Sequence, residues 1–113
     1  MESSSAAAES QHEAVRRISK ALFGNGYALE IAAAIASWQS PTVHARELAR
    51  ELAVPDNLVH PVLRRLVEAG ILVRLPRPRG QQYQEFERMP SLYWELCRQL
   101  FEEVSASAWN RAQ

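Results

Sequence analysis

The sequence predicts a mainly α-helical fold with one small β-hairpin, and three observations lead to this fold class. Apolar residues recur at helical spacing over most of the chain. Gly70 ends one of the predicted helices and is followed by a short apolar run, residues 71–75. Residues 76–80 contain two prolines, which restrict φ and cannot donate to a sheet, so this segment predicts a hairpin tip.

Length and composition predict one folded domain. The 113 residues carry no net charge and 47% of them are apolar, which disfavours both disorder and a generally basic protein. We expect residues 1–6, rich in serine and alanine, to be disordered and residues 7–113 to form the domain. Cys97 is the only cysteine, so neither an internal disulfide nor an all-cysteine metal site can form in one chain.

The sequence predicts a cytoplasmic protein without a membrane segment. Its longest apolar stretch, residues 28–38, is interrupted by Glu30 and falls well short of the roughly 20 residues that span a bilayer. The amino terminus lacks the basic start and the apolar run of a signal peptide. A lone cysteine also fits a reducing compartment.

Charge is distributed unevenly along the chain. Residues 57–80 hold five arginines and one acid, whereas residues 81–104 hold five acids and two arginines. The positive charge is therefore concentrated in one segment, for which a polyanion is the natural partner.

Two helices are predicted before the basic segment. The first covers residues 7–23 and ends at a break that contains two glycines. The second covers residues 27–39, where apolar side chains occupy the whole helical circumference, so we expect a central helix buried on most sides. Residues 42–43 follow it and can form a short strand.

A helix-turn-helix is predicted at residues 44–69. Its first helix begins at His44, which we interpret as the N-cap, with a metal or pH role as the alternative. Glu47 occupies the third position of a capping box. Residues 54–57 form the turn. The second helix has a core face at i, i+3, i+4, i+7 and i+8, made of Val59, Val62, Leu63, Leu66 and Val67.

The second helix is expected to stop in a Schellman motif, with Gly70 at C′ and an apolar contact between Leu66 and Ile71. Pro61 lies in the first half of this helix, where a proline removes a backbone hydrogen bond. Two interpretations stay open: the helix is kinked at Pro61, or its first regular turn begins near His60 with Pro61 at N1.

The remaining sequence predicts a basic hairpin and a last helix. Strands at residues 71–75 and 81–87 would flank the arginine-proline tip, and we refer to residues 71–88 as the wing. A long helix over residues 91–109 has one broad apolar stripe. The resulting element order, α-α-β-α-α-β-β-α, predicts a winged helix-turn-helix fold.

Two blocks of sequence carry a family resemblance, ARELARELAV at residues 45–54 and LRRLVEAGIL at residues 63–72. Over residues 27–100 the chain resembles the bacterial winged helix-turn-helix regulators of the ArsR and MarR type. This resemblance implies a homodimeric transcriptional regulator, most often a repressor. It also implies that the terminal helices pair, at residues 7–23 and 91–109, and that the recognition helix enters the major groove of DNA.

A weaker similarity concerns cofactors. Tyr27-Ala28-Leu29 together with Val62-Leu63 is similar to the iron–sulfur winged-helix regulators. The chain lacks the cysteine and histidine sets of metal-sensing ArsR proteins, and it also lacks the three cysteines that follow the wing in the iron–sulfur regulators. We therefore expect neither a metal nor another cofactor.

Two segments supply the predicted DNA contacts. On the recognition helix Asn57 can pair with adenine and Arg64 with guanine or a phosphate, although a capping role for Asn57 is an equal alternative. On the wing, Arg77 and Arg79 suit a minor groove, unless they only keep the hairpin tip soluble. The full predicted set is Asn57, His60, Arg64, Arg65, Arg74, Arg77 and Arg79.

The apolar stripe of the last helix is wider than one small domain can cover, and a second copy of the chain is its simplest cover. The helix at residues 7–23 is expected to join this interface. Cys97, within the stripe, is either a buried apolar residue or an oxidation sensor. The predicted interface comprises Val15, Ile18, Leu22, Tyr93, Leu96, Cys97, Leu100, Phe101 and Val104.

The leading functional hypothesis is a sequence-specific regulator that binds double-stranded DNA as a homodimer. The alternative is a winged-helix module for protein–protein interaction without specific DNA binding. We expect no enzyme, because the sequence has no nucleophile with a matching base and no glycine-rich phosphate loop. Six aromatic residues form either core or the lining of a pocket for a small-molecule effector: Tyr27, Trp38, Tyr93, Trp94, Phe101 and Trp109.

Overall fold

The computed structural model describes residues 10–81 and 83–112, with side chains as far as Ala106. The expected disorder of residues 1–6 and the predicted start of the first helix at residues 7–9 lie outside the described residues. Along the chain the elements are α2 (Gln11–Phe23), α3 (Ala28–Ala36), β1 (Thr42–His44), α4 (Ala45–Leu52), α5 (Asp56–Glu68), β2 (Leu72–Arg74), β3 (Glu85–Arg88) and α6 (Leu92–Ala112).

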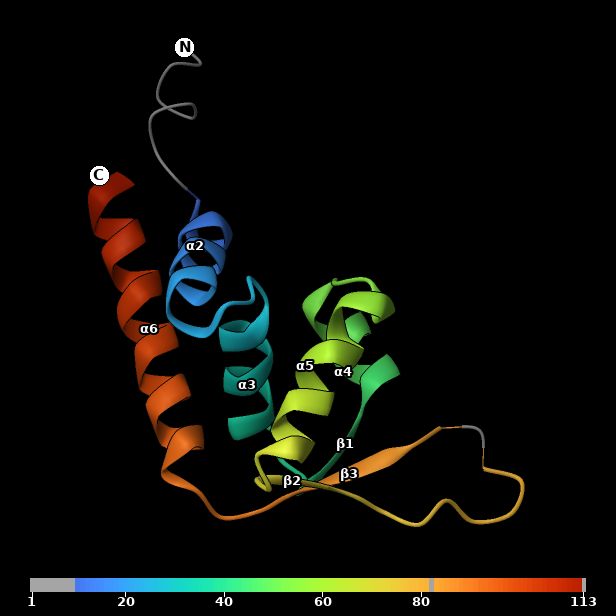
Figure 1. Cartoon of the computed structure of the whole chain (residues 1–113). Helices are drawn as coiled ribbons and strands as arrows, with labels where there is room; N and C mark the ends of the chain where they lie inside the picture. Colours follow the sequence, from blue (N-terminus) through green and yellow to red (C-terminus); the bar gives the residue numbers. More distant parts are fainter. Residues whose placement is uncertain (1–9, 82, 113) are drawn as a thin grey trace.

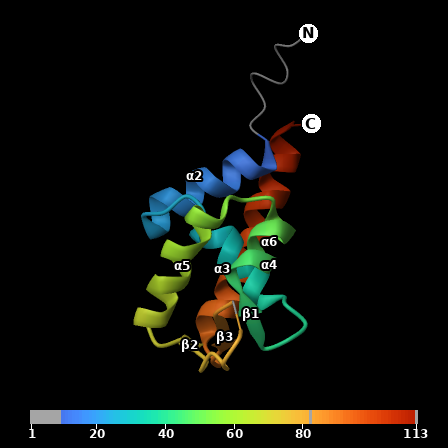
Figure 2. The ribbon, with the colours of Figure 1, turned by 90° about the vertical axis from the view of Figure 1, so that its right-hand side faces the viewer.

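These elements form two helical groups above one small sheet (Figure 1). Helix α6 lies along one side with α2 against it, and α3 occupies the centre between α6 and the α4–α5 pair. The hairpin of β2 and β3 extends from the base of the molecule below α5, as the side view in Figure 2 also shows. The predicted order and the mainly α-helical class with a small β-hairpin are both confirmed.

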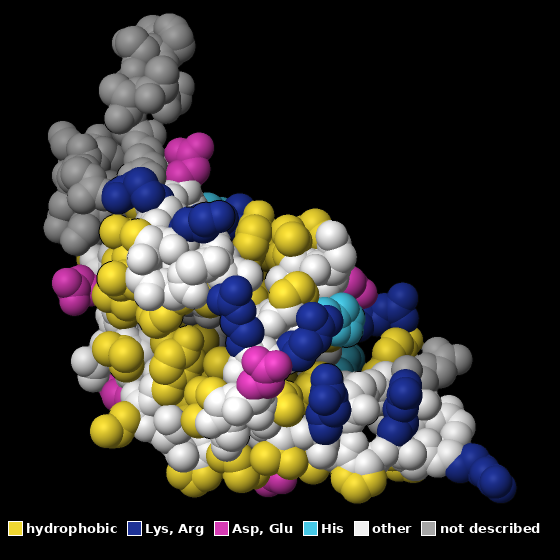
Figure 3. Space-filling model, viewed as in Figure 1, with side chains coloured by type: hydrophobic (Ala, Val, Ile, Leu, Met, Phe, Trp, Pro, Cys, Tyr) yellow, Lys and Arg dark blue, Asp and Glu magenta, His cyan; other side chains and the backbone are white. Residues whose placement is uncertain are grey.

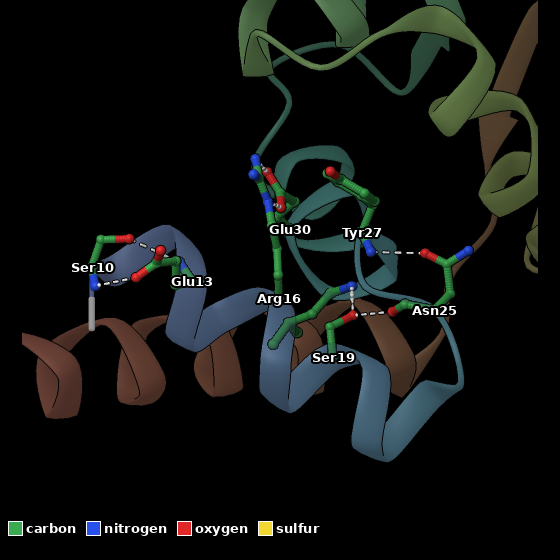
Figure 4. Close-up of polar contacts among 8 residues, drawn as sticks. Ser10, Glu13, Arg16, Ser19, Asn25, Tyr27 and Glu30 are labelled. Atoms are coloured by element: carbon green, nitrogen blue, oxygen red, sulfur yellow. Dashed lines mark hydrogen bonds and ion pairs between the residues drawn. The ribbon is translucent and has the colours of Figure 1, made fainter. Parts of the chain in front are cut away.

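Helix α2 begins with a complete capping box. The hydroxyl of Ser10 accepts the Glu13 N–H at 3.1 Å, and the Glu13 carboxylate accepts the Ser10 N–H at the same distance (Figure 4). The described helix therefore starts at Gln11, with Ser10 as its N-cap. It ends at Gly24, whose φ of 74° is the left-handed conformation that stops a helix.

Buried polar contacts hold α2 against α3. The hydroxyl of Ser19 donates to the Asn25 carbonyl at 2.6 Å and accepts the Leu29 N–H at 2.9 Å. Glu30, only 5% exposed, forms an ion pair with Arg16 at 2.8 Å (Figure 4). This hydrogen-bonded pair raises the pKa of Arg16, although burial of the arginine acts in the opposite direction. Glu30 is thus paired within the core, where an isolated charge would be costly.

Helix α3 is the buried central helix that its composition predicts, but it is shorter than residues 27–39. Tyr27 is its N-cap and Ser37 its C-cap. The guanidinium of Arg88, from β3, donates to the carbonyls of Ile35, Ala36 and Trp38, so these groups are satisfied without another helical turn. Its buried side chains are Ala28, Leu29, Glu30, Ile31, Ala32, Ala33 and Ile35.

The helix-turn-helix consists of α4 and α5. His44 is the N-cap of α4, as predicted, and its Nδ1 accepts the Glu47 N–H at 3.3 Å. Helix α5 begins at Asp56 and continues through Pro61, so the interpretation that its first regular turn starts near His60 is wrong. Pro61 lies in the second turn, and the Asn57 carbonyl lacks the helical N–H that any other residue there would donate.

The predicted Schellman motif ends α5. Gly70 has a φ of 81°, and its N–H donates to the Val67 carbonyl at 3.0 Å. The Ile71 N–H donates to the Leu66 carbonyl at 3.2 Å, which completes the pair of bonds that define the motif. The chain therefore turns directly from α5 into β2.

The sheet is antiparallel and has the order β1-β3-β2. Val43 pairs with Phe86, and Leu72 pairs with Arg88. The side chains of Val43, Phe86 and Leu72 are buried against the helices. The second strand of the wing, predicted at residues 81–87, begins only at Glu85. Just before it, Gln84 donates its side-chain amide to the Leu75 carbonyl at 2.6 Å.

Helix α6 begins one residue later than predicted and extends to Ala112 rather than to residue 109. Near its start, the indole of Trp94 is buried and donates to the Met89 carbonyl at 2.7 Å. On its exposed side Arg98 pairs with Glu95 and Glu102. Among the described residues, none of the helices combines the length and the apolar character needed to cross a membrane.

Candidate nucleic-acid interface

The predicted DNA-binding residues come from two elements, α5 and the wing, and every one of their side chains is exposed. Asn57, His60 and Arg64 follow one another at helical spacing on the solvent side of α5. Lysine and arginine side chains gather over α5 and the wing in Figure 3. The structure therefore brings both predicted segments onto one basic face.

The two neighbouring arginines of α5 differ in their contacts. Arg65 donates to the Phe23 carbonyl at 3.2 Å, so it connects α5 to the end of α2. Arg64 has no hydrogen bond or ion pair with the described part of the chain, and its guanidinium is open to a ligand. Their environments give Arg64 the better geometry for a contact with DNA.

Asn57 does not cap α5. The N-cap is Pro55, which supplies no side-chain hydrogen bond, and Asn57 is the second residue of the helix. The capping alternative is therefore wrong. The side-chain amide of Asn57 is exposed to solvent, next to Asp56 in the first turn of the helix.

The wing presents its arginines on both its strand and its tip. Arg74, at the end of β2, lies with its guanidinium 5.9 Å from the centre of the Phe86 ring. At the tip the Gln81 N–H donates to the Pro78 carbonyl at 3.0 Å, and Gly80 has a φ of 87°, so the chain reverses in a tight turn. Arg77 and Arg79 are exposed on this tip.

A cleft of about 470 Å³ separates the wing from the start of α5. Three arginines and one carboxylate line it, so its charge is mainly positive. Its lining residues are His44, Ala45, Arg46, Asp56, His60, Arg74, Arg77, Tyr83, Gln84 and Phe86.

Sequence reasoning missed three of the residues in this cleft: His44 as a lining residue, Arg46 and Tyr83. Tyr83 stacks on His44 with ring centres 5.5 Å apart and planes 13° apart, and its hydroxyl accepts from Arg46 at 2.5 Å. One signal was present, because Arg46 and Arg50 lie four residues apart on the exposed side of α4. The position of Tyr83 had no local signal, since its partners lie about 40 residues earlier.

Comparison with known proteins supports the fold. No protein-family model matches the chain, and no curated protein sequence matches it. Two crystal structures of E. coli MarR, the wild type in its apo form and a cysteine-to-serine mutant, each have a TM-score of 0.64 at 18% identity and cover 89% of this chain and 75% of MarR. The oxidized form of E. coli MarR has a TM-score of 0.59 at 16% identity, with 90% and 71% covered.

The chain has the winged-helix fold of MarR. This fold gives the described elements their usual names. Helices α4 and α5 are its helix-turn-helix, and β2 and β3 with their connection are the wing.

The residues predicted for a dimer interface occupy three different environments in this winged helix. Val15 and Cys97 lie in the core of the chain itself. Leu22 and Leu96 are 61% and 54% exposed, and Leu92, which was not predicted, is 88% exposed. The remaining members are partly buried: Ile18, Tyr93, Leu100, Phe101 and Val104.

Cys97 is fully buried in the winged helix, and burial raises the pKa of its thiol. A hydrogen bond with Tyr93, one turn earlier on α6, partly opposes this shift. Burial also raises the pKa of the Tyr93 hydroxyl, and the nearby thiol adds to that effect. Within the described residues, no three His, Cys, Asp or Glu side chains are placed to bind a metal ion.

The predicted aromatic residues do not surround one pocket. Trp94 is buried in the core, and Tyr27, Trp38 and Tyr93 pack against it. Phe101 alone among them lines a smaller cavity of about 290 Å³ between α3 and α6. The side chain of Trp109 lies outside the described residues.

Proposed function

We propose that this protein is a sequence-specific transcriptional regulator, acting as a repressor, that binds double-stranded DNA as a homodimer. The observation that carries the proposal is the mainly basic face formed by α5 and the wing. The MarR-like fold supports it, and so does the regulator resemblance at residues 45–54 and 63–72. No catalytic step is needed.

In this proposal α5 enters the major groove. A B-DNA major groove accepts one α-helix, and residues near the helix start normally reach the base edges. Asn57 would read adenine, and Arg64 would bind guanine or the adjoining phosphate. The arginines of the wing would follow the backbone into the neighbouring minor groove, where negative potential attracts them.

A second copy of the chain is the partner that we propose for the apolar surface of α6. Leu92 and Leu96 on α6 are exposed, and so is Leu22 on α2. The two helices meet nearby, where Phe23 and Tyr93 contact each other edge to face with ring centres 6.2 Å apart. Hydrophobic side chains gather on the left of Figure 3, over α2 and α6. A two-fold dimer would place two recognition helices about 34 Å apart, which is one turn of DNA.

Selection of bound fragments from bacterial genomic DNA tests the proposal. We expect enrichment of an inverted repeat whose half-site centres are about 10 base pairs apart, because the protein symmetry would match that of the site. An absence of enrichment at moderate salt would contradict the proposal and favour the protein-interaction module. A motif without two-fold symmetry would contradict the dimer alone.

We propose a cytoplasmic location, where chromosomal DNA is accessible. We also propose that a small-molecule effector can bind the protein. The cavity between α3 and α6 is the candidate for that effector, since most of its exposed lining surface is apolar and its polar lining residues are few: Glu30, Ser37, Arg98 and Glu102. A ligand there would contact the helix that we assign to the dimer.

A further inference from the structure

In the part of the chain that the structure describes, Tyr83 attaches the returning limb of the wing to the helix-turn-helix outside the sheet. The regular pairing of β3 with β1 and β2 ends at Glu85. Before that residue in the chain, Tyr83 reaches the N-terminus of α4 and contacts His44 and Arg46. We call these three residues, His44, Arg46 and Tyr83, the wing clamp.

The wing clamp combines three kinds of contact on one aromatic ring. The ring stacks nearly parallel to the imidazole of His44, its hydroxyl accepts a hydrogen bond from Arg46, and the guanidinium carbon of Arg46 lies 5.2 Å from the ring centre. His44 is itself fixed, because it caps α4 through Glu47. The tyrosine is thus attached to a rigid helix end.

The wing clamp forms one end of the cleft between the two basic elements. Arg74 and Arg77 line the cleft from the wing, and His60 lines it from α5. Tyr83 is 39% exposed, so its contacts are not needed to fill the core. These contacts instead attach the returning limb of the wing to the start of α4.

We infer that Tyr83, together with Arg46, is a positioning pair for DNA binding: it fixes the spacing between the arginines of the wing and the exposed side of α5. The inference rests on the function proposed above. A fixed wing reaches its groove without the entropic cost of ordering a loose hairpin, so the pair raises affinity without touching DNA.

Fluorine NMR tests the wing clamp without DNA. The chain has three tyrosines, Tyr27, Tyr83 and Tyr93, so 3-fluorotyrosine labelling introduces three fluorine nuclei, and Tyr83→Phe identifies the signal of Tyr83. Arg46→Ala should shift that signal. Arg50→Ala is the matched control, because Arg50 lies one turn later on α4 and outside the cleft, and it should leave the signal unchanged. An identical signal in Arg46→Ala overturns the inference.

Trypsin reports how well the tip is held. The Arg79–Gly80 bond is the cleavable bond at the tip, since the Arg77 bond precedes a proline. Tyr83→Ala and Arg46→Ala should each raise the cleavage rate roughly fivefold, and Tyr83→Phe should raise it less because its ring still stacks on His44. Equal rates in wild type and Tyr83→Ala overturn the inference. Thermal unfolding identifies a variant that has simply lost its fold.

Measurements of DNA affinity then distinguish a positioning role of Tyr83 from a direct contact with DNA. Tyr83→Ala should weaken affinity for the selected site roughly fivefold with an unchanged salt slope, because no phosphate contact is lost. Unchanged affinity, or a loss of about one unit of salt slope confined to Arg46→Ala, overturns the positioning role. If the wild type binds no DNA, the proposed function fails and the positioning role with it, whereas the fluorine and trypsin results still decide whether the clamp exists.

Discussion

At the scale of single residues, Arg64 and Arg65 show how neighbouring positions of one helix take different roles. Arg65 is exposed but is engaged by the Phe23 carbonyl, whereas Arg64 has no partner in the described part of the chain. The sequence predicts both as DNA contacts because both are basic and lie on the recognition helix. It gives no sign of the Phe23 contact, since the acceptor is a backbone carbonyl 42 residues away.

This difference makes the two arginines a matched pair of substitutions. Arg64→Ala should weaken binding to the selected site by about 1–3 kcal/mol and relax specificity at one base pair, because it removes a base-reading donor. Arg65→Ala should lower the melting temperature and affect DNA affinity less. Fluorescence anisotropy and thermal unfolding of both variants check this. The reverse pattern would reassign base reading to Arg65.

The two arginines of the wing tip are predicted to contact phosphates. Arg77→Ala and Arg79→Ala should each weaken binding across DNA sequences and reduce the salt slope by about one unit, because each removes a cation that displaces a counterion. Anisotropy over a salt series measures this, with Lys20→Ala on α2 as a control that is remote from the wing. Unchanged binding in both wing variants would remove the tip from the interface.

Cys97 predicts a loss of stability in alkali. Its folded pKa is raised by burial above the usual 9.0, so the unfolded thiol ionises first and proton release favours the unfolded state as the pH rises. The free energy of unfolding should therefore fall as the pH increases through and above about 9. Tyr93 acts in the same direction at still higher pH.

Urea titrations between neutral pH and pH 10 measure this dependence. Cys97→Ala should be less stable at neutral pH, because it opens a small cavity, but its stability should fall less steeply with pH. Parallel curves for the two proteins would show that the cysteine does not cause the alkaline loss. The same burial predicts slow reaction of the native thiol with alkylating reagents.

At the scale of elements, α5 contains a proline in its interior and still forms one helix. Pro61 lies in the second turn, and the helix continues on both sides of it. Val59, Val62 and Leu63 are buried there, so tertiary packing outweighs the missing backbone bond. Composition alone could not decide between the kink and the late start, because the burial of those side chains depends on distant helices.

Replacing this proline should stabilise the protein. Pro61→Ala restores an N–H that can donate to the Asn57 carbonyl, and we expect a gain on the order of 1–3 kcal/mol in the free energy of unfolding. Urea denaturation measures it, with His60→Ala as a control on the exposed side of the same turn. A loss of stability would mean that packing of the proline ring exceeds the value of the restored bond.

Element ends were predictable where their determinants are local. The end of α5 followed from Gly70 and Ile71, and the start of α4 followed from His44, because a cap involves only a few adjacent residues. The end of α3 and the pairing of β1 with β3 were not predicted. Both depend on contacts more than 40 residues apart, with Arg88 as a donor in the first case.

At the scale of the whole molecule, the apolar stripe of α6 divides between the core and the surface. Its spacing predicted an amphipathic helix, but not which of its members the chain covers itself. Cys97 is covered by the other helices, whereas Leu92 and Leu96 are left exposed. That division depends on how α2 and α3 pack across α6, which the pattern of a single helix does not contain.

The exposed part of this stripe predicts a dimer. Light scattering at micromolar concentration should give twice the mass of one chain, and Leu96→Lys should give the mass of one, because it places two charges in an apolar interface. Val73→Lys, an equally large change at an exposed apolar residue of β2, should leave the dimer intact. A monomeric wild type would contradict the prediction.

Arg88 anchors the last strand of the wing to the end of α3, and this limits which part of the wing can change in length. The root of the wing is attached to the central helix, so residues 76–81 connect two limbs that are held independently of the loop. Lengthening such a loop costs little, since closure entropy grows only slowly with length. Insertions at the tip can therefore change how far the wing extends while the core stays unchanged.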